Sequence, residues 1–237
     1  MQMKKLSEMV GVPLIEQVGK KIYLTEDGQE LAQATREIFG IMDRFTTLAA
    51  ERQGLKKGQL RLMAITTASY FAPRLLGEFA KLYPGIEVSL RVTNKEQVLA
   101  SIANNLDDLY LLGQPPEGME IESTPIMDNP IIVLAAPDHP LAKEKNISLE
   151  RLAQEPWLMR EKGNEAIKQA ILTGLGISAL SRHTLTLNQP GQFAVLDVQG
   201  YPILRHWYAI YPAGRQMSVA ARAFLDYLLE RPEQENT

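Results

Sequence analysis

The chain has 237 residues, of which 45% are hydrophobic and 22% charged, so it can bury one or two domain-sized cores and should be a soluble globular protein. It has no cysteines, which excludes disulfides and thiolate metal sites, no apolar run long enough to span a bilayer, and no apolar secretory signal in its first residues. A net charge of −3 argues against general affinity for nucleic acid, so any contact with DNA must be local. Together these features predict a cytoplasmic protein with no membrane partner.

Residues 1–28 predict a helix followed by a hairpin. Residues 2–10 are helix-prone, Gly11-Val-Pro bends the chain, and Val18-Gly-Lys-Lys can form a tight turn before the β-prone residues 22–24. A hairpin between two helices is typical of a winged helix-turn-helix, whose wing tip lies beside the phosphates of DNA, although it also occurs in unrelated domains. The cations that could contact phosphates here are Lys4, Lys5, Lys20 and Lys21.

Thr25 predicts the start of a long helix, because its hydroxyl can cap the helix and the carboxylates of Glu26 and Asp27 then lie at the positive end of the helix dipole. A helix over residues 26–52 would span about 40 Å. It could lie across the core of its own domain or pair with a second chain; we favour pairing, because no neighbouring segment has a matching apolar face. Residues 53–58 would then form a flexible hinge. The apolar seam recurs at heptad spacing and consists of Leu31, Ala34, Ile38, Ile41, Phe45 and Leu48.

The rest of the chain alternates strands and helices, as in α/β folds. This order takes the chain from a first lobe into a second lobe and back again, which implies two lobes around a cleft. Strands are predicted at residues 59–65, 87–92, 109–112, 130–137, 157–160 and 206–211, and a further strand follows the turn at 174–178. Helices are predicted at residues 73–83, 95–104, 164–172 and 218–230, with a short one that begins at Ser148.

The hairpin and its flanks, GVPLIEQVGKKIYLTEDG at residues 11–28, resemble the wing of the LysR-type transcriptional regulators, with Ile15 and Gln17 at positions where the family usually has Phe and Arg. The segments FAPRLLGEFAKLYPGIEVSL and IANNLDDLYLLG are similar to the family's first effector-binding subdomain. The segments NEAIKQAI, GLGISALSRHTL, RHWYAIYP and SVAARAFLDYLL most resemble its carbon-assimilation branch, the CbbR-type and CmpR-type regulators.

The resemblance implies an α/β fold in which a two-lobed effector domain, like that of the type II periplasmic binding proteins, follows a long linker helix and the remnant of a winged helix-turn-helix. The first residues resemble only the last turns of the family's recognition helix, whose preceding helices and base-reading residues would lie upstream of Met1. Such regulators assemble as homodimers or homotetramers. The implied domains are residues 1–28 as the remnant, 29–58 as the linker helix and hinge, 59–131 with 212–237 as subdomain I, and 132–211 as subdomain II.

The resemblance also predicts an internal gap after Gly163. The family has a turn, a helix and a strand between the segments that here end at Gly163 and begin at Asn164. With about 11 residues for a helix and about 5 each for a strand and a loop, roughly 20 to 25 residues are missing. One wall of the second lobe would be lost with them, and the affinity for an effector would fall.

A small anionic metabolite is expected to bind between the lobes. The segment ITTASY at residues 65–70 ends a strand just before a helix, so backbone N–H groups and hydroxyls converge there in a way that suits a carboxylate or a phosphate. The alternative is that these hydroxyls only cap their own helix. The family resemblance adds positions after the second strand and in the far lobe, so the predicted effector-binding residues are Thr66, Thr67, Ser69, Thr93, Asn94, Arg160, Gly176 and Ile177.

No catalytic, metal or cofactor site is predicted. The three histidines are far apart in sequence, the neighbours Asp107 and Asp108 would point to opposite sides of a strand, and the GLG at residues 174–176 lacks the third glycine of a dinucleotide fingerprint. The leading hypothesis is a transcriptional regulator that binds an anionic effector and, without its full reading head, binds DNA only weakly. The main alternative is a solute-binding transport receptor on the same fold, although such a receptor does not need the wing and the heptad helix. The third hypothesis is an enzyme on this fold.

Overall fold

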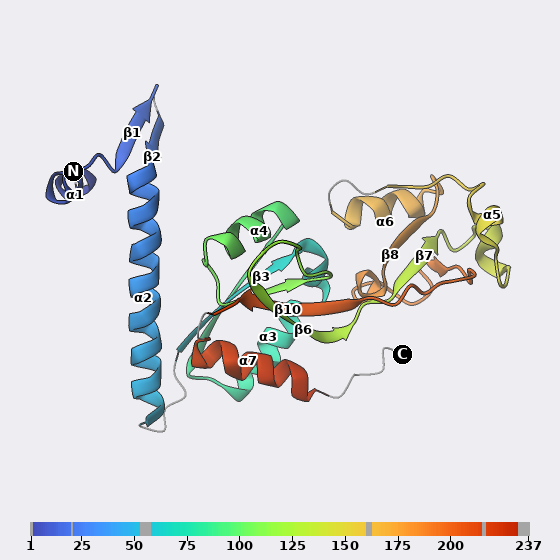
Figure 1. Ribbon diagram of the computed structural model, residues 1–237. Helices are drawn as coiled ribbons and strands as arrows, with labels where there is room; N and C mark the ends of the chain where they lie inside the picture. The colour runs from blue at the N-terminus through green and yellow to red at the C-terminus, as the bar shows by residue number, and fades with distance from the viewer. Residues whose placement is uncertain (1, 20, 53–57, 160–162, 215–216, 232–237) are drawn as a thin grey trace. The chain divides into compact units, whose positions relative to one another are not determined.

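The computed structural model describes residues 2–19, 21–52, 58–159, 163–214 and 217–231. The chain divides into two compact units, Met1–Gly58 and Gln59–Thr237 (Figure 1). Of the predicted hinge at 53–58, only Gly58 lies within the described residues. No helix in these ranges is both long and apolar enough to cross a membrane.

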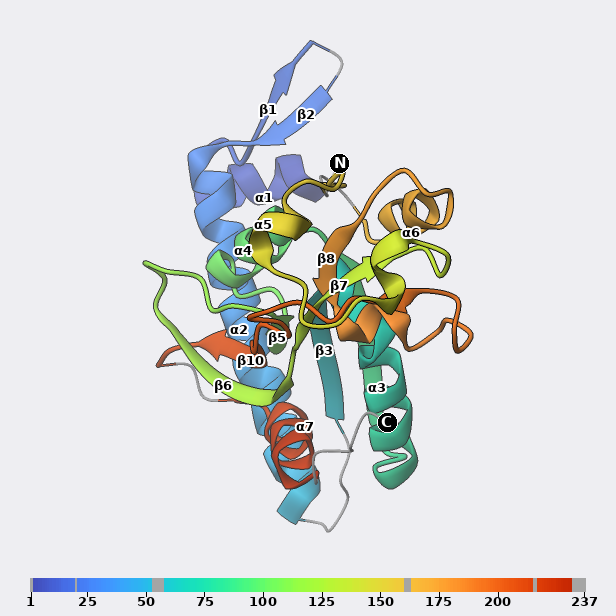
Figure 2. The ribbon, with the colours of Figure 1, turned by 90° about the vertical axis from the view of Figure 1, so that its right-hand side faces the viewer.

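The first unit contains the helix, the hairpin and the long helix that the sequence predicts. Thr25 caps the long helix as predicted, because its Oγ1 accepts a hydrogen bond from the Gly28 N–H at 3.0 Å. The same hydroxyl donates to the Pro13 carbonyl oxygen at 2.6 Å, so it also ties the helix to the chain that enters the hairpin. The elements are α1 (Gln2–Val10), the antiparallel strands β1 (Ile15–Val18) and β2 (Lys21–Leu24), and α2 (Glu26–Arg52), with the hairpin at the N-terminal end of α2 (Figure 2).

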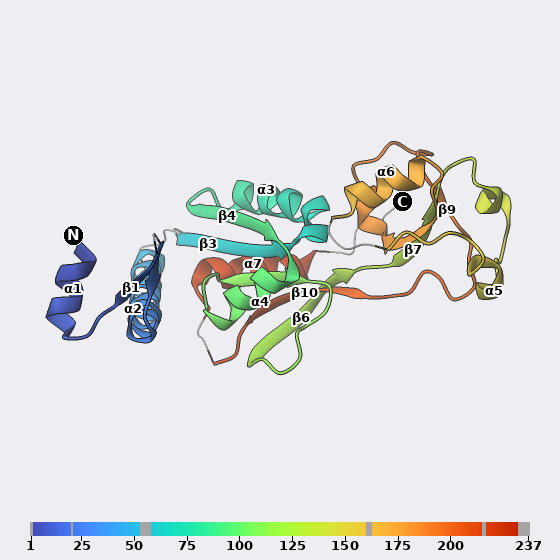
Figure 3. The same ribbon diagram turned by 90° about the horizontal axis from the view of Figure 1, so that it is seen from above.

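The second unit is an α/β structure with two sheets, which confirms the predicted two-lobed fold. The first lobe has five strands in the order β4-β3-β5-β10-β6, and the second lobe has three in the order β8-β7-β9. The chain passes from the first sheet to the second between β6 and β7 and returns through β10 (Figure 3). The strands are β3 (Gly58–Ile65), β4 (Ile86–Thr93), β5 (Leu109–Leu112), β6 (Ile121–Asp128), β7 (Ile131–Ala135), β8 (Ser178–Ser181), β9 (Ala194–Val195) and β10 (His206–Pro212).

The returning strand β10 belongs to the sheet of the first lobe, where it pairs antiparallel with both β5 and β6. The first lobe therefore resumes at His206, whereas the sequence places residues 132–211 in the second subdomain. The predicted division of the chain into domains otherwise stays a prediction.

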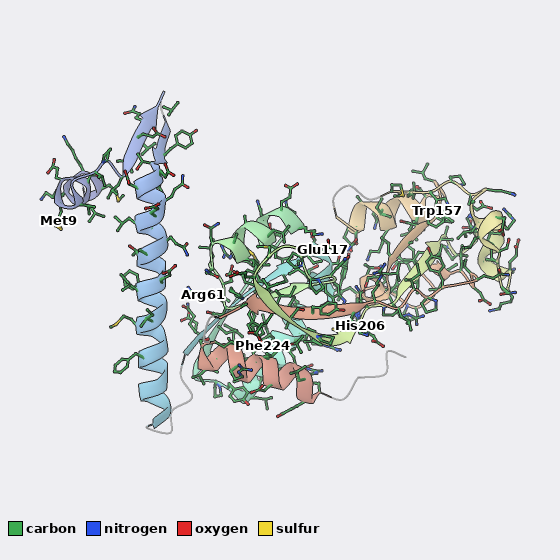
Figure 4. All side chains as sticks on the ribbon, in the orientation of Figure 1. Met9, Arg61, Glu117, Trp157, His206 and Phe224 are labelled. Carbon is green, nitrogen blue, oxygen red and sulfur yellow. The ribbon has the colours of Figure 1, made fainter. Side chains whose placement is uncertain are left out.

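Alternate residues of β3 face two different sets of helices, as the two-residue period of a strand requires. Leu60 and Leu62 lie in a core with α3 (Ala72–Leu82) and α7 (Val219–Glu230). In that core the rings of Phe79 and Phe224 meet edge to face, with their centroids 5.0 Å apart. Figure 4 labels Phe224 on α7. Met63 lies on the other face of the sheet, in a core with α4 (Lys95–Ala103).

The small sheet of the second lobe is also buried on both faces. Val133 lies in a core with Leu152 of the short helix α5 (Leu149–Leu152), and Ile132 lies in a second core with Ile171 of α6 (Glu165–Leu172). Ser148 begins α5 as predicted, since its Oγ accepts a hydrogen bond from the Arg151 N–H at 3.2 Å. Two 3₁₀ turns, η1 (Thr66–Tyr70) in the first lobe and η3 (Arg182–Leu185) in the second, lie close to each other.

The structure differs from the predicted strands in three places. No strand is predicted at 121–128, where Pro125 lacks the N–H that a central strand needs. The strand β6 tolerates the proline because, among the described residues, it lies at the edge of the sheet and pairs with β10 alone. The two-residue strand β9 is also not predicted. The strand predicted at 157–160 is wrong in its described part, where Trp157 forms an isolated bridge with Ile177.

Candidate functional site

The hydroxyl-rich segment predicted to bind an anion folds as the 3₁₀ turn η1, between the end of β3 and the start of α3. Thr66 Oγ1 donates to the Thr93 carbonyl oxygen at 3.4 Å, and Ser69 Oγ donates to the Thr66 carbonyl oxygen at 2.7 Å. The N-cap position of α3 is Phe71, which makes no side-chain cap bond. The hydroxyls of Thr66 and Ser69 therefore donate to carbonyl groups and do not cap α3.

Two further predicted residues of the first lobe lie beside this turn. Thr93 ends β4 and accepts the bond from Thr66, so the structure brings the two threonines together. Asn94 follows it as the N-cap of α4, where its Oδ1 accepts a hydrogen bond from the Gln97 N–H at 2.9 Å. The side-chain oxygen of Asn94 is therefore engaged within its own helix.

The predicted residues of the second lobe are placed differently. Gly176 is buried, and a Cβ atom there would lie 2.3 Å from the Pro156 carbonyl oxygen, so no larger residue fits. The Ile177 N–H donates to the same Pro156 carbonyl at 2.9 Å, and its side chain lies in the core of the second lobe. These contacts stay within the second lobe, and Arg160 lies outside the described residues.

Further residues, which are not among those predicted from the sequence, join the two lobes at η1. Asn164 Nδ2 donates to Thr67 Oγ1 at 3.2 Å. Tyr70 Oη donates to Oε1 of Glu165, the first residue of α6. Lys168, one turn further along α6, has its Nζ 2.9 Å from the same oxygen and 5.1 Å from the centroid of the Tyr70 ring.

The ammonium group of Lys168 is buried, with the residue only 2% exposed. Its Nζ donates to the Thr184 carbonyl oxygen at 2.8 Å and to Asn188 Oδ1 at 2.7 Å, in addition to its ion pair with Glu165. These three acceptors match the three N–H groups of an ammonium ion, which is what a buried charge requires.

Glu165 is ionised at neutral pH. Partial burial alone would raise the pKa of its carboxyl group, but the hydrogen bonds from Tyr70 and Lys168 outweigh that effect and lower the pKa below its ordinary value of 4.5. Because the pKa of Glu165 is lower in the folded chain, the resulting stabilisation is fully present above the unfolded pKa. It is lost as the pH falls from the unfolded pKa through the folded pKa. Its side chain is 63% exposed, so solvent screens this contribution.

His183 in η3 packs against the first lobe from the other side of the junction. Its ring centroid lies 5.3 Å from that of Phe71 and 6.5 Å from that of Trp207. Its Nε2 lies 2.8 Å from the Asp128 carbonyl oxygen, which is the arrangement of a neutral imidazole that donates to a carbonyl. Burial lowers the pKa of His183, although the hydrogen bond to Asp128 opposes this.

Comparison with known families identifies the family to which the chain belongs. The family model described as the LysR substrate binding domain matches residues 53–165 and 162–233. The chain belongs to the LysR family of transcriptional regulators. The two matched segments overlap at residues 162–165, the region in which the sequence predicts missing residues.

The relatives of this chain are regulators of carbon assimilation, not enzymes. The HTH-type transcriptional activator CmpR of Synechocystis is 49% identical over 259 residues, which cover 98% of this chain and 85% of CmpR. The RuBisCO operon transcriptional regulator of Acidithiobacillus ferrooxidans is 41% identical, and the alignment covers 96% of this chain and 82% of that regulator. An alignment of 259 positions against a chain of 237 residues leaves at least 22 positions of CmpR without a counterpart here, which agrees with the predicted gap.

Solved structures of LysR regulators are similar to this chain. The CcmR regulatory domain of Synechocystis PCC6803, solved in complex with 2-PG, is 46% identical with a TM-score of 0.69 and covers 73% of this chain and 96% of that domain. A full-length OxyR variant from Pseudomonas aeruginosa has a TM-score of 0.76 over 97% of this chain and 86% of its own. At 19% identity, OxyR supports the fold alone.

His183→Gln should make the free energy of unfolding depend less on pH just below the ordinary histidine pKa. The unfolded chain takes up a proton at His183 as the pH falls below 6.5, whereas burial lowers the pKa of the folded form, so the wild type loses stability through that window. Urea unfolding at about pH 7.5 and about pH 5.5 should show a larger loss for the wild type than for the variant. Equal slopes for the wild type and the variant would show that His183 does not titrate as described.

Proposed function

We propose that this LysR regulator controls carbon-assimilation genes in response to a small anionic metabolite that binds at the lobe junction around η1. The observation that carries the proposal is the similarity, at 46% identity, to a CcmR regulatory domain solved with 2-PG, an anion. The geometry of η1 supports it, because Thr66 and Ser69 bring hydroxyl groups to the end of β3, and the bond from Asn164 to Thr67 holds the start of α6 beside them. Action on genes would place the protein in the cytoplasm.

The proposed ligand contacts are those predicted from the sequence. Thr66 is exposed, and its bond to the Thr93 carbonyl is long, so its hydroxyl can turn toward a ligand. Thr67 is buried and engaged with Asn164, which suits a role in holding α6 beside the loop. The remaining proposed contacts are Ser69, Thr93, Asn94, Arg160, Gly176 and Ile177.

Thr66→Val should weaken the binding of such a ligand about tenfold, because it removes one hydrogen bond to a charged group. Calorimetry with 2-phosphoglycolate, 2-oxoglutarate and ribulose bisphosphate measures this on the whole chain. Thr173→Val is the matched control, since Thr173 lies at the opposite end of α6 and its Oγ1 bonds to the Ala170 carbonyl. A ligand that bound the Thr66→Val variant as tightly as the wild type would place the site elsewhere.

We also propose that the protein forms a homodimer or homotetramer through α2. Four apolar side chains in the middle of this helix, Ile38, Ile41, Met42 and Phe45, are each more than half exposed (60%, 56%, 55% and 65%). Such a patch marks an interaction surface in a soluble protein. The predicted seam also includes Leu31 and Ala34, which are described, and Leu48, whose side chain is outside the described residues.

The double substitution Ile38→Glu/Ile41→Glu should lower the oligomeric state, because it buries unpaired carboxylates in an apolar interface. Light scattering at roughly 50 µM measures the mass of each variant. The control Gln29→Glu adds a carboxylate at an exposed position of α2 away from the seam and should leave the mass unchanged. A wild type that is already monomeric would contradict pairing through this helix.

We further propose that the first unit contacts DNA phosphates. Lys4 and Lys5 are exposed on α1; Lys20 lies outside the described residues, and Lys21 belongs to β2, with its side chain outside them. Lysine contacts to phosphates provide affinity without sequence preference.

Lys4→Gln/Lys5→Gln should weaken binding to any duplex and reduce its dependence on salt, by about one unit of slope for each phosphate that is no longer neutralised. Fluorescence titration with two unrelated duplexes should give dissociation constants of about 10⁻⁴ to 10⁻⁶ M for this chain. The control Lys143→Gln/Lys145→Gln removes two exposed charges from the second lobe and should leave the affinity for DNA and its dependence on salt unchanged. Nanomolar binding with preference for one duplex would overturn the proposal for this chain.

A further inference from the structure

Tyr70 and Lys168 direct their donors at one oxygen atom from the two sides of the lobe junction. Tyr70 lies at the end of η1 in the first lobe, and Lys168 lies on α6 in the second. Tyr70 Oη donates to Glu165 Oε1, and Lys168 Nζ lies 2.9 Å from the same atom. A hydroxyl and an ammonium that converge on one point select a negatively charged oxygen there.

Both donors are held in place by contacts that do not involve Glu165. Lys168 is 2% exposed, and its Nζ is fixed by its hydrogen bonds to the Thr184 carbonyl oxygen and to Asn188 Oδ1. The ring of Tyr70 lies beside Lys168, with its centroid 5.1 Å from Nζ, and the next residue, Phe71, anchors the backbone through its buried ring, whose centroid is 4.9 Å from that of Trp207. The donor pair is therefore preorganised, and it would accept another anionic oxygen without moving.

The oxygen that now lies between them belongs to a side chain that can leave. Glu165 is the first residue of α6, and its side chain is 63% exposed, so it can turn into solvent without opening the core. The bond from Asn164 to Thr67 would still hold the start of α6 beside η1. An anionic oxygen from outside could then take the same position.

We propose that Tyr70 and Lys168 bind an anionic oxygen of the ligand, and that the carboxylate of Glu165 occupies their position when no ligand is bound. The inference rests on the proposed function and supplies it with a cation inside the described part of the chain, whereas Arg160 is outside it. A phosphate or carboxylate group must displace Glu165 to bind. The resident carboxylate therefore lowers the affinity for every anionic ligand and sets the concentration at which the protein responds.

Calorimetry with 2-phosphoglycolate, and separately with inorganic phosphate, tests this on the whole chain. Glu165→Gln should tighten the binding of both anions about tenfold, because a neutral amide competes less well than a carboxylate for an ammonium and a phenol. Tyr70→Phe should weaken both about tenfold, and Lys168→Met should weaken them further. Lys168 is buried, so if Lys168→Met fails to fold, Tyr70→Phe decides the question.

The chain offers a matched control pair. Tyr211 Oη donates to Glu122 Oε2 at 2.8 Å, between β10 and β6 of the first lobe, and so repeats the tyrosine–glutamate contact away from α6. Glu122→Gln and Tyr211→Phe should leave the affinity for both anions unchanged.

The outcomes separate this inference from the proposed function. If Glu165→Gln and Tyr70→Phe bind like the wild type while Thr66→Val binds more weakly, the inference is overturned and the proposed function stands. If every variant, Thr66→Val included, binds like the wild type, both fail. Weaker binding to Glu165→Gln, or no binding of either anion to that variant, would also overturn the inference.

Discussion

The buried ammonium of Lys168 is the constraint on which the lobe junction depends. A charge removed from water must be surrounded by acceptors, and these come from η3, from the turn that follows it and from the first turn of α6. Because Lys168 lies on α6 and two of its acceptors lie in η3 and just after it, α6 and η3 cannot shift separately. His183 of η3 packs in turn on Phe71 at the start of α3, so the constraint extends into the first lobe.

Elements with strong local signals could be placed from the sequence alone. The long helix begins where its capping threonine predicts, and β3 shows the two-residue period of a buried strand. The edge strand β6 could not be placed in this way, because Pro125 breaks the local signal and the stability of the strand comes from β10, which lies far along the chain. Long-range pairing decides such strands, and local propensity does not reveal it.

In the candidate site, too, some features follow from the sequence and others depend on contacts between distant residues. The family resemblance groups Thr66 with Thr93, and in the structure each lies at the end of a strand in one sheet. The contact between Tyr70 and Glu165 joins residues 95 positions apart, and no local pattern reports it. One signal did exist, because Lys168 lies three residues before the buried Ile171 and therefore falls on the apolar side of its helix. A lysine at such a position must find acceptors inside the protein.

The hairpin and the long helix behave mechanically as one body. A Cβ atom on Gly28 would lie 2.0 Å from the Leu14 carbonyl oxygen, and Thr25 bonds both the helix and the residue before Leu14, so the joint has no room for slippage. A rotation of the 27-residue helix α2 about its axis would therefore rotate the hairpin with it. The tip of the hairpin would sweep an arc, and a small twist at the far end of the helix would become a sideways displacement at whatever surface the tip touches.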